Sequence, residues 1–174
     1  MVDSQKKILK LFFDNPSAKL HLREIARKTG FSPMGASKIL KELVKEKLVI
    51  REETRAVVNF RPNLDNKKFF ALKRGYNLNK IRSSRLLAEL IETYEHPETI
   101  VVFGSYASGY DMEDSDVDIL IITPLTRELD LTNYEKEFKR KVNVHELKNL
   151  KKASNEFINN IVNGVVLYGY LKIK

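Results

Sequence analysis

A glycine-serine pair and two aspartates are the residues in this chain whose types and spacing best suit chemistry. Gly104 and Ser105 follow the apolar run of residues 100–103, and Asp116 and Asp118 come after a ten-residue interval, where a second apolar run begins. Residues two apart in a strand point to the same face, so the two carboxylates project together. Paired carboxylates repel each other unless a cation lies between them, and oxygen ligands suit Mg²⁺ shared with substrate phosphates. The spacing therefore predicts a site for magnesium and phosphate.

Two strands and a turn have to position these groups. The run over residues 100–103 is rich in β-branched residues and lies between Pro97 and Gly104, which predicts a buried strand that ends in a turn. A glycine lets backbone amides approach a phosphate, and a helix that starts at Ser105 would add its positive N-terminal end. Phosphate and metal are then expected at neighbouring strand ends.

The same residues resemble a known signature. Residues 104–109, Gly-Ser-Tyr-Ala-Ser-Gly, and residues 115–119, Ser-Asp-Val-Asp-Ile, resemble the DNA polymerase β nucleotidyltransferase superfamily, in particular its minimal nucleotidyltransferase branch. The resemblance covers roughly residues 83–170. It implies an in-line attack of an acceptor on the α-phosphate of ATP or another nucleoside triphosphate, with release of pyrophosphate. The roles it implies are nucleotide binding by Gly104, Ser105 and Ser115, and catalysis and Mg²⁺ or Mn²⁺ binding by Asp116 and Asp118.

Two positions depart from that signature. Relatives carry a third carboxylate on a neighbouring strand, here expected over residues 141–147, and Asn143 stands in its place. An asparagine carbonyl can bind Mg²⁺, so Asn143 is a third candidate ligand, but it adds no negative charge and is a poor base. His145 has the strand parity to act as a base or to be a packed residue, whereas Glu146 should face away. Ser108 stands where relatives often have an arginine, so turnover is left open by the sequence.

Composition bounds the class of protein. The 174 residues include no cysteine, which excludes disulfides and thiolate metal sites. No apolar run approaches the roughly 20 residues needed to cross a bilayer, and the N-terminus lacks the apolar segment of a signal peptide. We therefore expect a cytoplasmic protein with no membrane partner, large enough for one medium domain or two small ones.

Charge is distributed unevenly along the chain. Residues 1–82 hold 20 Lys and Arg against 8 Asp and Glu, a balance of +12, whereas residues 83–174 hold 11 against 15, a balance of −4. A basic segment joined to a mildly acidic one indicates that the first part binds a polyanion and the second does not. Solvated lysine faces with no such partner are the alternative.

The first 62 residues read as helix, short strand, two further helices and two strands. Ser4 is expected to cap the first helix and Gly30 to end the second, while Ser32 and Pro33 begin a third that runs to about Lys47. The inward positions of the third helix recur with helical periodicity at Ala36, Ile39, Leu40, Leu43 and Val44.

With two strands expected over residues 48–51 and 56–61, this segment resembles the winged helix-turn-helix DNA-binding domains of prokaryotic regulators. Residues 22–30 and 32–43 carry the resemblance. In that family the second helix of the motif enters the major groove of double-stranded DNA, and basic residues contact phosphates. The resemblance and the charge assign DNA binding to Ser32, Met34, Ser37, Lys38, Lys41, Arg51 and Arg55. A winged helix used only for protein contacts is the alternative.

The expected fold is α+β, in three segments. These are a winged helix-turn-helix over residues 1–62, a helical connector over 63–82, and a nucleotidyltransferase-like mixed sheet flanked by helices over 83–174. In the third segment a helix begins near Ser83 or Ser84, and another covers residues 131–140. Further expectations are a helix over residues 149–163 with Phe157, Ile158, Ile161 and Val162 inward, then a closing strand in which Tyr168 and Tyr170 pack.

Three functions remain open at the level of sequence. In the first, the protein transfers a nucleotidyl group to a protein or small-molecule acceptor, as an antitoxin-like regulator that modifies a helical toxin-like partner. In the second, it is a transcriptional regulator whose degenerate nucleotidyltransferase domain only senses nucleotide. In the third, that domain serves dimerisation. A homodimer suits winged-helix binding to two half-sites in all three.

Overall fold

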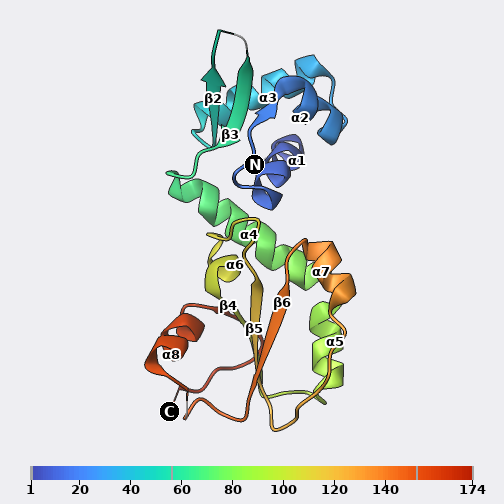
Figure 1. The fold of residues 1–174 in the computed structure, drawn as a ribbon, viewed down its shortest axis with the longest axis vertical. Helices are drawn as coiled ribbons and strands as arrows, with labels where there is room; N and C mark the ends of the chain where they lie inside the picture. The colour runs from blue at the N-terminus through green and yellow to red at the C-terminus, as the bar shows by residue number, and fades with distance from the viewer. Residues whose placement is uncertain (1, 56, 152, 174) are drawn as a thin grey trace. The chain divides into compact units, whose positions relative to one another are not determined.

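The computed structural model describes residues 2–55, 57–151 and 153–173. The chain forms two compact units, Met1–Lys73 and Arg74–Lys174, and the helices and sheets of both confirm the α+β class (Figure 1). Ala56, where a strand was expected to begin, and Lys152, inside an expected helix, lie outside the described residues. In the described part of the chain, no helix is both long and apolar enough to cross a membrane.

The first unit packs three helices against a small sheet. Its elements are α1 (Asp3–Asp14), β1 (Leu20–His21), α2 (Leu22–Thr29), α3 (Pro33–Lys45), β2 (Val49–Glu53) and β3 (Val58–Pro62). The strands lie in the order β1-β3-β2 and are antiparallel. Fully buried apolar residues from the three helices meet in its core, among them Ile8, Leu9, Phe12, Ile25, Leu40 and Leu43.

Turn and cap residues fix the ends of these helices. Gly30 ends α2 in the left-handed conformation, with φ of +71°, and the Ser32 hydroxyl caps α3 by accepting the backbone N–H of Gly35 at 3.1 Å. Both ends confirm the sequence prediction. The predicted cap at Ser4 is wrong, because α1 begins at Asp3 and its N-cap is Val2.

Helix α4 (Lys67–Ser83) contains the boundary between the two units. In the first unit, Phe69 is fully buried and its ring centroid lies 5.2 Å from that of Phe13. In the second unit, Asn77 and Ile81 are buried. The three-segment division drawn from the sequence stays a prediction.

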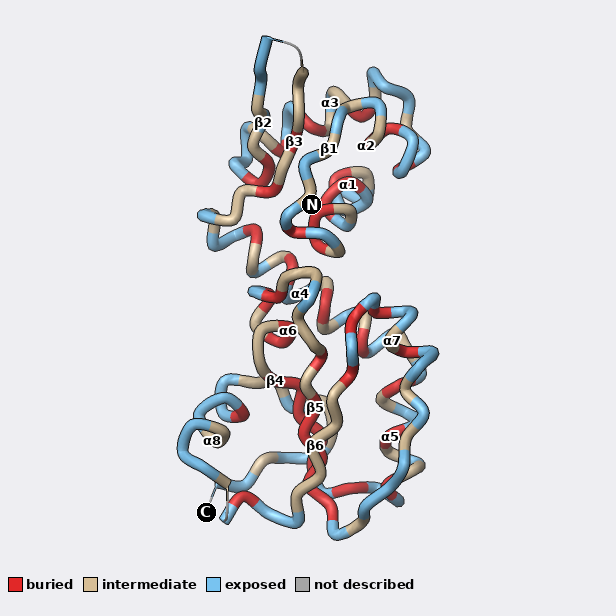
Figure 2. The backbone as a smooth tube through the Cα atoms, in the orientation of Figure 1, coloured by how far each residue is buried: buried red, intermediate tan, exposed pale blue. Residues whose placement is uncertain are grey.

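The second unit is a four-stranded mixed sheet covered by helices. Its further elements are α5 (Leu86–Thr93), β4 (Thr99–Phe103), α6 (Gly104–Ser108), β5 (Val117–Ile122), α7 (Thr132–Phe138), β6 (Val142–Leu147), α8 (Asn155–Val162) and β7 (Val165–Gly169). The strand order is β6-β5-β4-β7, in which β5 and β6 are parallel and the other pairs antiparallel. Figure 2 shows the two central strands, β4 and β5, as largely buried.

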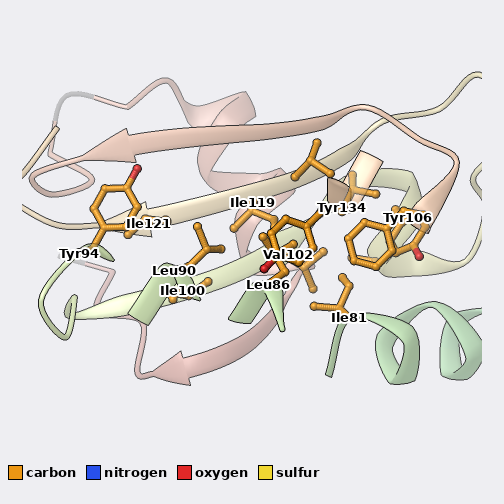
Figure 3. Close-up of a cluster of buried hydrophobic side chains, with 14 residues drawn as sticks. Ile81, Leu86, Leu90, Tyr94, Ile100, Val102, Tyr106, Ile119, Ile121 and Tyr134 are labelled. Atoms are coloured by element: carbon orange, nitrogen blue, oxygen red, sulfur yellow. The ribbon is translucent and has the colours of Figure 1, made fainter. Parts of the chain in front are cut away.

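Alternate residues of the central strands serve two cores. On one face, Ile100, Val102, Ile119 and Ile121 pack with residues of α5 and α7, including Leu86, Leu90 and Tyr134 (Figure 3). On the other face, Val101, Phe103, Leu120 and Ile122 pack with Ile161 of α8. Asp118 has the parity of Leu120 and therefore lies on the α8 face, at the end of the strand.

Four expectations for α5, α8 and the tail are corrected. Helix α5 begins at Leu86, slightly later than expected, and α8 begins only at Asn155, because the Ser154 hydroxyl accepts the backbone N–H of Phe157 and caps it there. Val162 is 51% exposed and not inward, since only Ile161 of this short helix is fully buried. Tyr170 is 61% exposed and does not pack as expected, whereas Tyr168 packs partly buried against the α5 side of the sheet.

Candidate functional site

The candidate site begins with the register of two parallel strands. Asp118 of β5 pairs with Asn143 of β6, and Asp116 lies just before β5. The Asn143 amide nitrogen donates to Asp116 Oδ2 at 2.9 Å and to Asp118 Oδ1 at 3.3 Å. The two carboxylates therefore point to one place, as the sequence predicts, and the asparagine amide lies between them.

Gly104 brings the preceding turn against the same carboxylates. Phe103 pairs with Asp118 across β4 and β5, so Gly104 follows directly beside the acid. Its φ is +74°, and a Cβ at this position would lie 2.9 Å from Asp118 Oδ2. Only a glycine satisfies both the backbone conformation and the close approach. This is the closeness that the Gly-Ser motif predicts.

The serines of the motif are placed differently from one another. Ser105 is partly exposed in the five-residue helix α6, and the Ser108 hydroxyl donates to the backbone oxygens of Gly104 at 3.1 Å and Ser105 at 2.9 Å. The Ser115 hydroxyl accepts the backbone N–H of Met112 at 2.9 Å and so stabilises the turn before Asp116. Gly104 follows the residue that pairs with Asp118, whereas Ser115 lies at the other end of the ten-residue interval.

A depression of about 510 Å³ opens beside Asp116. Ser115 and Asp116 line one part of it, together with Glu113, Asp114 and Glu135. Its cationic lining comes from the end of α7 and the start of β6, with Lys136, Lys139, Arg140 and Lys141. Acidic and basic groups thus share one solvent-accessible hollow next to the carboxylate pair.

The two residues near Asn143 point to opposite faces, as strand parity predicts. His145 Nε2 lies 3.8 Å from Asp118 Oδ1, and its ring packs against Phe103 and Phe157 at centroid distances of 5.5 and 5.8 Å. Glu146 faces the other core, where it accepts the hydroxyl of Tyr94 and the backbone N–H of Arg127 at 3.0 Å. Burial acts to raise the pKa of Glu146, but these hydrogen bonds hold it below its usual value.

Asp116, Asp118 and Asn143 fit a magnesium ion by the chemistry of their donor atoms. Among the described residues, no group of three or more His, Cys, Asp or Glu side chains could hold a metal ion. Mg²⁺, however, commonly takes only one or two carboxylates and completes its shell with water and substrate phosphates. Two carboxylates on one strand face and one amide oxygen meet that need once the amide turns its oxygen inward.

Sequence reasoning missed a buried polar cluster beneath the motif. The Asn77 amide nitrogen donates to Asp111 Oδ1 at 2.7 Å and to the backbone oxygen of Tyr106 at 2.9 Å. Arg140 Nη2 lies 3.4 Å from Asp111 Oδ2, and these groups are almost fully buried. The cluster ties the interval between Ser105 and Asp116 to α4. An acidic residue within that interval was the only signal in the sequence.

A second candidate surface, for nucleic acid, lies on α3. One hollow is lined by Leu22, Pro33, Met34, Ser37, Lys38 and Lys41, and a neighbouring one adds Arg51 of β2. The structure thus brings together five of the seven predicted DNA-binding residues, Met34, Ser37, Lys38, Lys41 and Arg51. Met34 is 84% exposed, and both lysines are exposed.

The other two predicted DNA-binding residues, Ser32 and Arg55, do not line these hollows. Ser32 uses its hydroxyl as the cap of α3, and Arg55 is exposed in the turn between β2 and β3. In the wing, Arg51 Nη1 pairs with Glu53 Oε2 at 2.8 Å, while Glu52 is held by Arg61 and by Lys19. The Arg51–Glu53 pair is about half exposed to solvent, so breaking it for a phosphate contact costs little, whereas the Arg61–Glu52 pair is only about one third exposed.

Comparison with solved structures finds proteins with a similar fold over part of the chain. A MarR family protein from Bacillus stearothermophilus is 18% identical, with a TM-score of 0.41, over 54% of this chain and 61% of that one. A mutant of ZitR from Lactococcus lactis is 20% identical, also at 0.41, over 53% and 61%. A MarR family transcriptional regulator from Silicibacter pomeroyi is 18% identical, at 0.40, over 51% and 62%. The chain thus spans about three fifths of their length.

Family models describe both units. No curated protein matches the sequence. A model of winged helix-turn-helix DNA-binding domains matches residues 1–50, where α1 to α3 lie. A model named polymerase beta, nucleotidyltransferase matches residues 86–172, half of the chain, including Gly104, Asp116, Asp118 and Asn143. The chain therefore belongs to the polymerase beta nucleotidyltransferase family and carries an N-terminal winged helix-turn-helix DNA-binding domain.

Proposed function

We propose that this protein binds a Mg²⁺-nucleoside triphosphate, ATP or another, at the Gly104 turn and the Asp116–Asp118 pair, and transfers a nucleotidyl group. The observation that carries the proposal is the convergence of both carboxylates and Asn143 within hydrogen-bond distance, beside a glycine whose position leaves no room for a Cβ next to Asp118. A bound Mg²⁺ or Mn²⁺ would neutralise phosphate charge and align the α-phosphate for attack. The chain's own carboxylates orient that ion, and the glycine turn admits the phosphates.

The depression beside Asp116 supports the same assignment. Lys136, Lys139 and Lys141 are among the residues that line it. A triphosphate needs such positive charge, and Ser108 does not supply the charge that an arginine gives to relatives. We infer that these lysines take over that part of phosphate binding.

The partners of the proposed reaction follow from the two units. The exposed basic face of α3 binds double-stranded DNA. The protein binds an operator as a homodimer on two half-sites, and this binding regulates transcription. The acceptor of the nucleotidyl group is a protein or a small molecule. The resemblance to minimal nucleotidyltransferases favours a helical toxin-like protein, which makes the chain an antitoxin-like regulator.

A second candidate function is favoured by Asn143 itself. Because the third acid of the family is an amide here, the site lacks the carboxylate that draws the proton from the attacking hydroxyl. The chain would then sense a nucleotide, or use the domain for dimerisation, and report through its DNA-binding unit without turnover.

Transfer of label from α-labelled ATP separates these functions. The full chain is incubated with Mg²⁺, labelled ATP and a helical partner protein, and compared with the double variant Asp116→Ala plus Asp118→Ala. Label on an acceptor with the wild type, lost in the double variant, supports transfer. Binding of ATP by the wild type without transfer supports the sensor. Absence of any metal-dependent nucleotide binding contradicts both.

A further inference from the structure

The amide of Asn143 lies where a cation between the two carboxylates would lie. Its nitrogen is 2.9 Å from Asp116 Oδ2 and 3.3 Å from Asp118 Oδ1, so both contacts come from one NH₂ group. An amide NH₂ has two hydrogens and can donate one to each acid. The nitrogen thus bridges the same two oxygens that a divalent ion would bridge.

The hydrogen bonds from the Asn143 amide offset the electrostatic repulsion between Asp116 and Asp118. Two like charges on one strand face are unfavourable, and hydrogen bonds to charged groups are stronger than those between neutral groups. Among the side chains that the structure describes, His145 is the other polar group near the pair, and it lies 3.8 Å from Asp118 alone. Asn143 is therefore the group that holds Asp116 and Asp118 together without a cation.

The Asn143 amide faces the carboxylates with its NH₂ group, which cannot bind a metal ion. The NH₂ group is a donor with no lone pair to offer, whereas the carbonyl oxygen is a hard ligand that suits Mg²⁺. A cation that enters must break both hydrogen bonds, and the amide must turn about its last side-chain bond to bring Oδ1 inward.

We propose that Asn143 is a latch on the cation site, which competes with a divalent ion for Asp116 and Asp118 until a nucleotide delivers that ion. The proposal rests on the cation site of the proposed function and adds a role for the residue that departs from the family. Triphosphate oxygens supply further ligands, so the metal-nucleotide complex displaces the latch where the bare ion does not. Cation binding by the wild type then depends on nucleotide, whereas a site with an aspartate at this position would bind the cation without nucleotide.

Binding of Mn²⁺ without nucleotide, followed by the electron paramagnetic resonance signal of the free ion, tests the latch in the full chain. Asn143→Ala removes the competing donor, and we expect it to bind Mn²⁺ at least about threefold more tightly than the wild type. Asn143→Asp adds a third carboxylate and is expected to bind at least about tenfold more tightly. Asn160→Ala, on the exposed side of α8, is the matched control and should bind like the wild type.

If Asn143 acts on the bare ion mainly as a ligand through Oδ1, the sign is the opposite, because Asn143→Ala then loses an oxygen donor and gains nothing. If Asn143→Ala binds Mn²⁺ as weakly as the wild type or more weakly, the residue is not a latch and the proposal is overturned. If Asn143→Ala does not fold, Asn143→Ser, which keeps a small polar group, carries the same expectation and the same contradiction.

Thermal unfolding gives a second readout and separates failure of the latch from failure of the site. The melting temperature of Asn143→Asp should fall in a chelator and recover in Mn²⁺, while that of the wild type should be the same in both. If Asn143→Asp binds Mn²⁺ but the Mn²⁺ affinity of Asn143→Ala does not exceed that of the wild type, the cation site is supported and the latch is contradicted. If Asn143→Asp binds no Mn²⁺ either, the cation site of the proposed function fails and the latch with it.

Discussion

The basic face of α3 and the carboxylate site of the second unit differ in how far their side chains depend on one another. On α3, Lys38 and Lys41 are exposed, and neither ammonium forms an ion pair with another described residue. At the site, Asp116 and Asp118 share the amide of Asn143, and Asp118 leaves no room for a Cβ at Gly104. The first surface therefore adds independent charges, whereas at the second each change alters its neighbours.

The two regions also differ in the electrostatic forces on which their proposed binding depends. Residues 1–82 carry a balance of +12, and residues 83–174 one of −4. Binding of DNA by the first region is expected to fall steeply with salt, because it releases counterions. The metal-nucleotide binding proposed for the second region is expected to depend on short-range coordination in a partly buried place, where screening by salt is weaker.

The largest expected effect comes from Gly104→Val. A residue with a Cβ at φ of +74° is strained by about 1–3 kcal/mol, and the new Cβ would lie 2.9 Å from Asp118 Oδ2. We expect the free energy of unfolding to fall by about 2 kcal/mol, and Mg²⁺-ATP binding to be lost. Urea unfolding and calorimetric titration measure the two.

Gly75→Ala is the matched control for that strain. Gly75 lies inside α4, and a Cβ there would meet no atom within 4 Å. The substitution should raise the free energy of unfolding by about 0.5–1 kcal/mol, because alanine favours helix interiors. Equal destabilisation by the two variants would show that the environment of Gly104 is not special.

Charge reversal on α3 is expected to have the next effect. The double variant Lys38→Glu plus Lys41→Glu should lose at least about tenfold in DNA affinity, or about 1.4 kcal/mol, with a salt slope shallower by about 2. Nucleotide binding should not change. Fluorescence anisotropy at several salt concentrations measures both quantities, and Lys10→Glu, exposed on α1, is the control. A loss with Lys10→Glu equal to that of the double variant would refute a specific role for α3.

Ser32 allows helix capping to be separated from DNA contact. Ser32→Ala removes the hydroxyl that accepts the Gly35 N–H, and should lower the free energy of unfolding by about 1 kcal/mol. Ser32→Asp keeps a capping oxygen, so it should unfold like the wild type but bind DNA less tightly through its charge. If Ser32→Asp binds DNA like the wild type, Ser32 does not face the phosphates.

The smallest expected effect concerns Glu146 of β6, which faces away from the carboxylate site, and its contribution to stability at low pH. Burial raises the pKa of Glu146, but hydrogen bonds from Tyr94 and from the Arg127 backbone hold that pKa below its ordinary value of 4.5. A carboxyl with a lowered folded-state pKa stabilises the protein above pH 4.5, and this contribution is lost as pH falls through the folded value. Glu146→Gln should flatten the decline of stability below pH 4.5, measured by urea unfolding, and an unchanged decline would exclude Glu146 as its source.

Local patterns in the sequence account for much of the fold. The Ser32-Pro33 cap, the Gly30 stop and the buried strand before Gly104 each depend on neighbours along the chain, and each is confirmed. The family resemblance places Asn143 at the position of the third acid, near the two aspartates, while the roles of these residues with metal and nucleotide stay predictions.

Features that depend on distant residues were missed or wrong. The Asn77–Asp111 hydrogen bond joins residues 34 positions apart, and buried polar pairs leave no periodic signal. Val162 and Tyr170 look like core residues by type, yet both are exposed, because the packing of α8 and the tail decides their burial. Hydrophobicity alone predicts burial least well near a chain end.

Equilibrium binding of ATP, with Mg²⁺ and with a chelator, tests the assignment of the nucleotide site to the carboxylate pair most directly. The wild type is compared with Asp116→Ala plus Asp118→Ala, and DNA binding is measured on the same samples. We predict that the wild type binds ATP only with Mg²⁺, and that the double variant loses this binding while its DNA affinity is unchanged. Mg²⁺-dependent ATP binding by the double variant as tight as that of the wild type would contradict the account.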